Sequence, residues 1–225
     1  MKILIIEDEK DLLESVLIYL NQEGYSCESA SDFESASLKI NLYTYDCVVV
    51  DISLPGGSGL DLIKILRNIN NRPGIIIFSA NNSVEDKVIG LEIGSDDYLT
   101  KPFHLSELNA RIKSVIRRVK FNGNQDIIFN EIKIVPDQMM VFINKESIIL
   151  TKKEFNILVF FVSNSGRVLT KESIVEHIWG DDSDMFDSFD FLYSHIKNLR
   201  KKLIDKGSRD YIQSIYGIGY KFLNA

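Results

Sequence analysis

The chain has 225 residues, with 26 lysines and arginines against 32 aspartates and glutamates, and a formal net charge of −6. This length favours two domains with separate cores, and the negative charge excludes nucleic-acid binding through bulk positive charge. No apolar run approaches the ~20 residues that span a bilayer, and acidic residues at 7–9 occupy the place of a signal peptide's apolar core. We therefore expect a cytoplasmic protein that does not enter the membrane.

The distribution of charge and the cysteine content further restrict the functions that this chain can have. Residues 126–225 carry 13 lysines and arginines against 14 aspartates and glutamates, so DNA binding by this half needs a local basic patch. The two cysteines, Cys27 and Cys47, lie inside strand-like segments. We expect both to be buried and reduced, in preference to a disulfide or a metal site.

The first half alternates short β-rich apolar runs with amphipathic stretches five times. This alternation is typical of an α/β doubly wound fold, in which helices cover both faces of a parallel sheet. Strands are expected near residues 2–6, 25–29, 46–50, 74–79 and 96–99. Helices are expected near residues 10–22, 33–41, 58–69, 83–92 and 104–119.

Polar side chains follow the ends of four of these strands. Glu7 and Asp8 follow the first strand and Asp51 ends the third. Ligands of open α/β sheets bind beyond the carboxyl ends of the strands, so these carboxylates should meet at one edge and bind Mg²⁺ or Mn²⁺. Ser79 and Lys101 add a hydroxyl and an ammonium. Together these groups suit the transfer of a phosphoryl group to an aspartate.

Four short strings at these strand ends resemble the signature of a response-regulator receiver domain, which has a flavodoxin-like five-stranded sheet. They are Glu7-Asp8, Asp51, Ser79-Ala80 and Lys101-Pro102-Phe103, and the resemblance covers roughly the first half of the chain. It implies that Asp51 accepts a phosphoryl group from a cognate sensor histidine kinase. Lys101 and Ser79 then have catalytic roles beside it.

The same resemblance implies a metal site and a conformational switch. Asp8, Asp51 and the Ser53 carbonyl would hold Mg²⁺, with Glu7 acting through water. The bond from Lys101 to Pro102 would be cis. Tyr98 would turn inward when Ser79 bonds the phosphoryl group.

Receivers of this family dimerise on phosphorylation through charged residues of the fourth helix, fifth strand and fifth helix. Taken singly, such residues are ordinary surface charges, because exposed pairs contribute only ~0–1 kcal/mol each. Taken as a two-fold network, they would make the homodimer specific. The matching positions are Lys87, Glu92, Asp96, Asp97, Glu107, Arg111 and Arg118.

The second half has a different pattern. A polar stretch at 120–125 reads as a linker between a first domain at 1–119 and a second at 126–225. Four short strands are expected at 127–129, 132–135, 139–143 and 147–150, followed by three helices and a C-terminal hairpin within 211–222. Thr151 and Glu154 form the pattern of a capping box at the first of these helices. The order of elements predicts an α+β winged helix-turn-helix.

Four strings of the second half resemble the effector domain of OmpR/PhoB-type response regulators. They are 150–155, 166–170, 195–203 and 217–220. Leu192, Ile196, Leu199 and Leu203 form a core stripe on the third helix, so the opposite stripe is the candidate recognition face, although such a basic face can also be merely solvated. The candidate contacts to double-stranded DNA are Phe191, Ser194, His195, Lys197, Asn198, Arg200, Lys201, Lys202, Ser214, Tyr216 and Lys221.

Three departures from the effector pattern matter. Asp190 and Phe191 stand near the start of the third helix, where relatives often carry basic or small polar residues, and Tyr216 stands where an arginine is common. Asp190 either accepts from a cytosine amine or caps the helix. An acidic loop before this helix is either a surface for RNA polymerase or a solvated loop; its acids are Asp181, Asp182, Asp184 and Asp187.

The whole pattern predicts a two-component transcription regulator rather than an enzyme, acting as a phosphorylation-induced homodimer on tandem DNA sites. An aspartyl-phosphate phosphatase is the enzyme alternative. It is disfavoured because the first strand does not end in an Asp-x-Asp motif and Ser53, not an acid, stands two residues beyond Asp51. A regulator that works without phosphate is disfavoured by the complete set of acids.

Overall fold

The computed structural model describes the chain except for residues 70–71, 81–82, 122, 125, 181–187 and 225. The chain divides into an N-terminal unit, Lys2–Gly123, and a C-terminal unit that includes Asn124–Ala225. Each unit is described separately below.

A five-stranded parallel sheet forms the centre of the N-terminal unit, with the strand order β2-β1-β3-β6-β7. Its central strands are continuous apolar runs because both faces are buried. The strands are β1 Lys2–Ile6, β2 Ser26–Ala30, β3 Cys47–Asp51, β6 Gly74–Ser79 and β7 Asp97–Thr100. All five lie within a residue of the predicted positions, and the doubly wound fold is confirmed.

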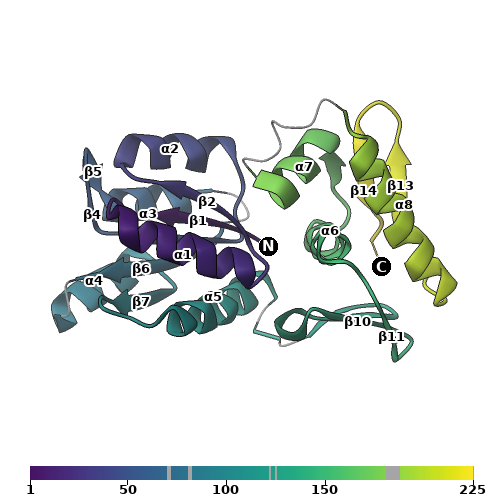
Figure 1. Ribbon diagram of the computed structural model, residues 1–225, viewed down its shortest axis with the longest axis horizontal. Helices are drawn as coiled ribbons and strands as arrows, with labels where there is room; N and C mark the ends of the chain where they lie inside the picture. Colours follow the sequence, from purple (N-terminus) through teal and green to yellow (C-terminus); the bar gives the residue numbers. More distant parts are fainter. Residues whose placement is uncertain (70–71, 81–82, 122, 125, 181–187, 225) are drawn as a thin grey trace. The chain divides into compact units, whose positions relative to one another are not determined.

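Five helices cover this sheet. Helices α1 and α5 contact each other on one face, and α2, α3 and α4 form a contiguous row on the other (Figure 1). They are α1 Lys10–Gln22, α2 Phe33–Leu42, α3 Gly59–Arg67, α4 Val84–Ile93 and α5 Leu105–Lys120. A two-stranded hairpin, β4 Ser53–Leu54 with β5 Gly57–Ser58, lies between β3 and α3, where the sequence indicated only a turn.

A buried ion pair lies at the opposite end of β1 from the acidic residues. The Lys2 ammonium has no exposure and lies 2.7 Å from the Glu28 carboxylate, whose side chain is 2 % exposed. The Tyr45 hydroxyl donates to the same carboxylate at 2.6 Å, and the rings of Tyr43 and Tyr45 lie within 4.8 Å of the ammonium. Lys39 adds a second, weaker positive charge at 3.7 Å.

The C-terminal unit combines two antiparallel sheets with three helices. The first sheet has the order β11-β10-β9-β8 and the second β12-β14-β13. Its elements are β8 Ile127–Phe129, β9 Ile132–Val135, η1 Pro136–Gln138, β10 Met140–Ile143, β11 Glu146–Ile148, α6 Lys152–Ser163, β12 Val168–Thr170, α7 Lys171–Trp179, α8 Asp190–Asp205, β13 Ile212–Ile215 and β14 Gly219–Phe222. The predicted winged-helix order is confirmed.

The prediction of a C-terminal hairpin was incomplete, because a third strand pairs with the hairpin. Residues 168–170, for which no strand was predicted, form β12 and pair with β14. Gly219 allows this pairing, because a Cβ there would lie 2.1 Å from the Leu169 carbonyl oxygen. The capping box at α6 is confirmed: Thr151 Oγ1 accepts from the Glu154 amide, and the Glu154 carboxylate accepts from the Thr151 amide.

Candidate functional site

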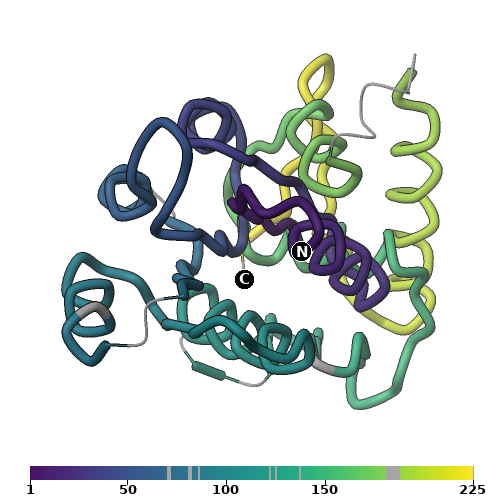
Figure 2. The backbone as a smooth tube through the Cα atoms, turned by 60° about the vertical axis from the view of Figure 1, so that its left-hand side comes forward, coloured from purple at the N-terminus to yellow at the C-terminus, as the bar shows by residue number. Residues whose placement is uncertain are grey.

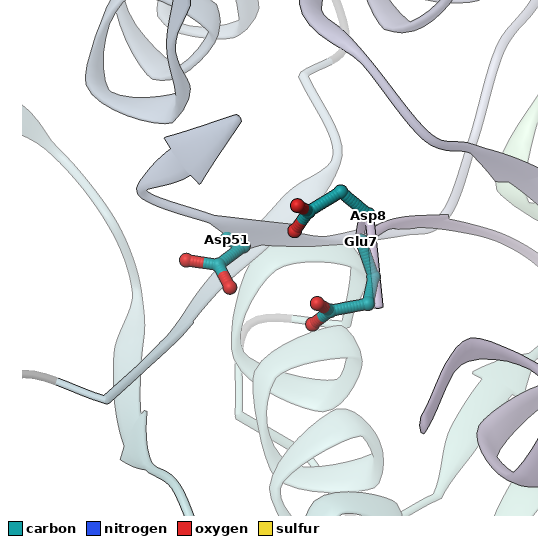
Figure 3. Close-up of side chains that lie close together, drawn as sticks. All are labelled: Glu7, Asp8 and Asp51. Atoms are coloured by element: carbon teal, nitrogen blue, oxygen red, sulfur yellow. The ribbon is translucent and has the colours of Figure 1, made fainter. Parts of the chain in front are cut away.

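The strands β1 and β3 bring three carboxylates together beyond their carboxyl ends. One carboxylate oxygen from each of Glu7, Asp8 and Asp51 lies within 4.8 Å of the others. Figure 3 shows the three side chains converging on one space. Glu7 and Asp51 are buried, whereas Asp8 is exposed. Solvent therefore reaches the cluster on the Asp8 side. The buried carboxylates of Glu7 and Asp51 need partners within the protein.

Lys101 supplies the fixed positive charge. Its ammonium lies 2.6 Å from the Glu7 carboxylate and 2.6 Å from the Asp51 carboxylate. Burial would lower the pKa of Lys101, but hydrogen bonds to Asp51 and Glu7 outweigh it and raise the pKa. Burial raises the pKa of Glu7, and the Lys101 hydrogen bond offsets this only in part. One ammonium thus serves two carboxylates, and negative charge remains in excess.

This donor set fits a hard divalent cation. Three carboxylates offer only oxygen ligands, which is what Mg²⁺ and Mn²⁺ prefer. A single ammonium, that of Lys101, contacts Glu7 and Asp51, so the three carboxylates carry negative charge that such a cation would balance. The Ser53 amide donates to Asp51 at 3.0 Å and orients that carboxylate.

The loop after Asp51 is folded tightly against the site. A Cβ at Gly59 would lie 1.9 Å from the Asp51 carbonyl oxygen, so only glycine fits there. Gly59 begins α3, and the Gly59 amide donates to the Ile52 carbonyl at 2.9 Å. This close approach fixes the backbone that carries both Asp51 and Ser53.

The predicted hydroxyl and switch residues also lie on the neighbouring strands. Ser79 ends β6, one residue beyond Phe78, the partner of Asp51 in the sheet register. Its side chain is buried, and its carbonyl accepts from the Lys101 amide at 2.9 Å. Tyr98 is 8 % exposed and packs in the hydrophobic core with Ile77. The bond from Lys101 to Pro102 is cis, as predicted.

The structure brings together only part of the expected dimer face. Arg111 bonds both Asp97, at 2.9 Å, and Glu107, at 2.8 Å, within the same chain. Lys87 is half-buried and Glu92 exposed on α4. Arg118 donates to the carbonyl of Asp96 rather than to its carboxylate.

Asp96 has a partner that the sequence did not reveal. Arg72 makes two hydrogen bonds to its carboxylate, at 2.7 and 3.0 Å, and the Ile75 amide donates to the same group at 2.9 Å. The parallel register of β6 and β7 was the available signal, because it places the starts of both strands side by side. The Asp96 carboxylate is thus bonded within the chain by groups that the sequence did not single out.

The third helix of the C-terminal unit, α8, has the predicted core stripe. Leu192, Ile196, Leu199 and Leu203 are buried. Among the candidate DNA contacts on α8, four have exposed side chains: Ser194, Lys197, Asn198 and Lys201. The helix is seen lengthwise in Figure 2 as the yellow-green coil.

Four other candidates on α8 are engaged within the chain. Phe191 and His195 are half-buried and contact the Trp179 ring, with centroid distances of 4.9 and 5.6 Å. Arg200 forms an ion pair with Asp210. Lys202 lies 2.7 Å from the buried Glu154 carboxylate and so joins α8 to the α6 cap.

The hairpin residues differ in exposure. Ser214 and Tyr216 are exposed, and Lys221 is half-buried. The Asp190 carboxylate accepts a hydrogen bond from the Ser188 hydroxyl at 3.1 Å, but Phe189 is the N-cap residue of α8 and makes no side-chain cap hydrogen bond, so the capping alternative is not supported. The acidic loop with Asp181, Asp182, Asp184 and Asp187 lies outside the described residues.

Each of the two units matches a known protein family. Residues 3–113 match the response regulator receiver domain, and residues 145–222 match the family described as transcriptional regulatory protein, C terminal. The chain is 37 % identical over 222 residues to the transcriptional regulatory protein PmrA of Pectobacterium parmentieri, covering 98 % of this chain and 96 % of that one. It is 35 % identical over 224 residues to the phosphate regulon regulator PhoB of Escherichia coli, covering 98 % and 97 %.

A solved structure is similar over the N-terminal unit. The receiver domain of the Francisella response regulator 1452 is 39 % identical, with a TM-score of 0.50, and the match covers 53 % of this chain and 98 % of that one. In the parts of the chain that the structure describes, no helix is long and apolar enough to cross a membrane.

A receiver followed by a winged-helix unit defines a response regulator that acts on DNA. More narrowly, the chain belongs to the OmpR/PhoB family of response regulators, which regulate transcription. The N-terminal unit is its receiver domain and the C-terminal unit its DNA-binding effector domain.

Proposed function

We propose that Asp51 is the phosphoacceptor of this regulator. The observation that supports it most is the position of its buried carboxylate, which lies 2.6 Å from the Lys101 ammonium and within 4.8 Å of the two acids that follow β1. An Asp51 oxygen would form a bond to phosphorus while the phosphorus–nitrogen bond of a kinase phosphohistidine breaks, and the electron pair would stay on the imidazole nitrogen. Lys101 and the Ser79 hydroxyl would hold the phosphoryl oxygens.

Asp8, Asp51 and the Ser53 carbonyl would hold Mg²⁺ or Mn²⁺, with Glu7 contributing through water. When bound, the ion neutralises charge that develops on the transferring phosphoryl group. Asp8 is the exposed member of the cluster, so it marks the side from which the ion and the phosphodonor enter. Tyr98, already buried beside Ile77, is the proposed switch residue that responds to Ser79.

Peptide mapping tests the assignment of Asp51. After incubation of the full-length protein with acetyl phosphate and Mg²⁺, borohydride trapping and mass spectrometry should find one modified residue, Asp51. The Asp51→Asn variant should take up no label, because among the described residues Asp51 is the carboxylate that belongs to the cluster, contacts Lys101 and ends the strand next to that of Ser79. Label that persists on this variant would place the phosphorylation site elsewhere.

Phosphorylation is proposed to produce a homodimer through the face formed by α4, β7 and α5. Asp97, Glu107 and Arg111 already form a charged cluster there within one chain, and the same groups can exchange partners across a two-fold axis. The Asp96 carboxylate contributes less than the sequence suggested, because Arg72 and the Ile75 amide occupy it. Lys87, Glu92 and Arg118 complete the proposed face.

Arg111→Glu should keep the phosphorylated protein monomeric in light scattering, because it places a negative charge among Asp97, Glu107 and their counterparts. Lys113→Glu is the matched control. It makes the same charge change on the same helix, but Lys113 lies 3.8 Å from Glu23 of the α1 segment and away from the cluster. The control should dimerise like the wild type. A phosphorylated Arg111→Glu dimer of wild-type strength would rule out this face.

The effector domain is proposed to place α8 in the major groove of double-stranded DNA, with dimers on tandem repeat sites. Ser194, Lys197, Asn198 and Lys201 are its exposed candidates, and Ser214, Tyr216 and Lys221 belong to the wing. Arg200 and Lys202 would have to leave their present carboxylate partners to reach phosphate. A regulator of chromosomal DNA acts in the cytoplasm. The acidic loop at 181–187 is kept as a proposed contact for RNA polymerase.

A further inference from the structure

The ring of Phe78 lies directly beside the phosphorylation site. Phe78 is fully buried near the end of β6 and is paired in register with Asp51 on one side and Leu99 on the other. The Lys101 ammonium lies 4.9 Å from the centre of its ring. At this distance a cation is attracted by the negative potential of an aromatic face.

The same ring also meets the residue that follows the Lys101–Pro102 bond. The Phe78 and Phe103 rings are 5.9 Å apart at an interplanar angle of 74°, which is an edge-to-face contact. Phe78 therefore contacts the segment that carries Lys101 at two points: the Lys101 ammonium and the Phe103 ring. An aliphatic side chain at this position would provide neither interaction.

We propose that Phe78 is a positioning residue, which holds the Lys101 ammonium against the phosphoryl-transfer site. Lysine has a flexible four-carbon stem and binds as a point charge, so its carboxylate partners alone do not fix where it lies. The buried ring, 4.9 Å from the ammonium, adds a third contact that restricts where the ammonium lies. When Asp51 takes up a phosphoryl group, the ammonium has to follow the new oxygens, and the ring keeps it within reach.

This inference rests on the proposed function, in which Asp51 accepts the phosphoryl group and Lys101 binds its oxygens. The proposed interaction depends on the negative potential of the ring face and not on the volume of the ring. Replacing Phe78 by 4-fluoro-, 3,5-difluoro- and 3,4,5-trifluorophenylalanine weakens the negative potential of the face in steps while nearly preserving the shape. Phe78→Leu removes the ring altogether. The same fluorinated residues at Phe161, which is packed against Tyr220 and Phe222 in the effector domain, provide the matched control.

The rate of Asp51 phosphorylation by acetyl phosphate, at fixed Mg²⁺, should fall in steps along the Phe78 series. We expect a total decrease of about three- to tenfold, the range of a moderate cation–π interaction. The Phe161 series should leave the rate unchanged. Each protein is first checked for folding by circular dichroism, and the fluorinated series carries the test if Phe78→Leu does not fold.

A spectroscopic measurement without metal complements the rates. In protein labelled with ¹³C at the lysine ε position, the ε-methylene protons of Lys101, assigned by their loss in Lys101→Met, should be shifted upfield by the ring. This shift should disappear in Phe78→Leu. Equal rates along the Phe78 series, or an unshifted Lys101 resonance in the wild type, would overturn the proposal. Label on a residue other than Asp51 would instead overturn the proposed function on which it rests.

Discussion

Replacing Glu28 with glutamine is expected to lower the free energy of unfolding of the receiver domain by about 3–5 kcal/mol, the cost of leaving a buried charge without its partner. Lys2 has no exposure, so its ammonium cannot be solvated when the Glu28 carboxylate is lost. The Tyr45 hydroxyl also loses its charged acceptor. Urea denaturation of the full-length protein, followed by a probe in the receiver, measures the change.

Asp61→Asn is the control for this prediction. Asp61 and Lys64 also lie 2.8 Å apart, but both are more than half exposed, so breaking their pair should cost less than about 1 kcal/mol. Similar losses in the two variants would contradict the role assigned to burial. A Glu28→Gln protein as stable as the wild type would show that the Lys2–Glu28 pair does not contribute to the fold.

The contribution of Glu28 to the free energy of unfolding should also depend on pH. Burial would raise the pKa of Glu28, but hydrogen bonds from Lys2 and Tyr45 and the charges of Lys2 and Lys39 outweigh it and lower the pKa. The stabilisation is therefore fully present above the unfolded-state pKa of about 4.3 and is lost as the pH falls through the lower folded-state value. The stability difference between wild type and Glu28→Gln should shrink across that acidic window.

Replacing Asp8 with asparagine is expected to weaken Mg²⁺ binding by at least about 100-fold, because loss of an outer-shell partner alone costs about 10–100-fold. Asp8 is the exposed carboxylate of the cluster and is a proposed direct ligand. The rate of phosphorylation by acetyl phosphate should fall in parallel at low Mg²⁺. Calorimetric titration with Mg²⁺ and the Mg²⁺ dependence of the rate are the two measurements.

Glu9→Gln provides the control for the metal prediction. Glu9 is the next exposed acid along the chain, and its contact with Glu7 uses the backbone amide, which glutamine retains. This variant should bind Mg²⁺ as the wild type does. An Asp8→Asn protein with unchanged Mg²⁺ affinity would remove Asp8 from the metal site.

The sequence was sufficient for those features that depend on periodicity and strand ends. Alternating apolar runs predicted the five parallel strands, and the polar residues that follow them predicted which side chains gather at one edge. The gathering of Glu7, Asp51 and Lys101 at one edge follows from parallel topology, because the carboxyl ends of all five strands share that edge. The capping box at Thr151 was visible for a similar reason, since its spacing is local.

Contacts between residues far apart in the chain were harder to predict from the sequence. The pair Arg72–Asp96 could be anticipated only from the register of β6 and β7, which the sequence does not give. The pair Glu154–Lys202 joins segments whose relative position depends on side-chain packing, which periodicity does not encode. For the same reason the sequence named Arg200 as a candidate DNA contact without indicating its ion pair with Asp210. The strand β12 was missed because it forms by pairing of residues 168–170 with residues 219–221, which lie far along the chain.

Phosphorylation of Asp51 is proposed to control DNA binding by joining two effector domains. The most direct test uses fluorescence anisotropy on a duplex with two half-sites, selected from a random library, and on a duplex with one. Wild type and Asp51→Asn are titrated with and without acetyl phosphate and Mg²⁺. The wild type should gain about 100-fold or more in affinity for the two-site duplex on phosphorylation, as expected for linked binding modules, and little for one site. Asp51→Asn should gain nothing, and an equal gain by both proteins, or by neither, would contradict the account.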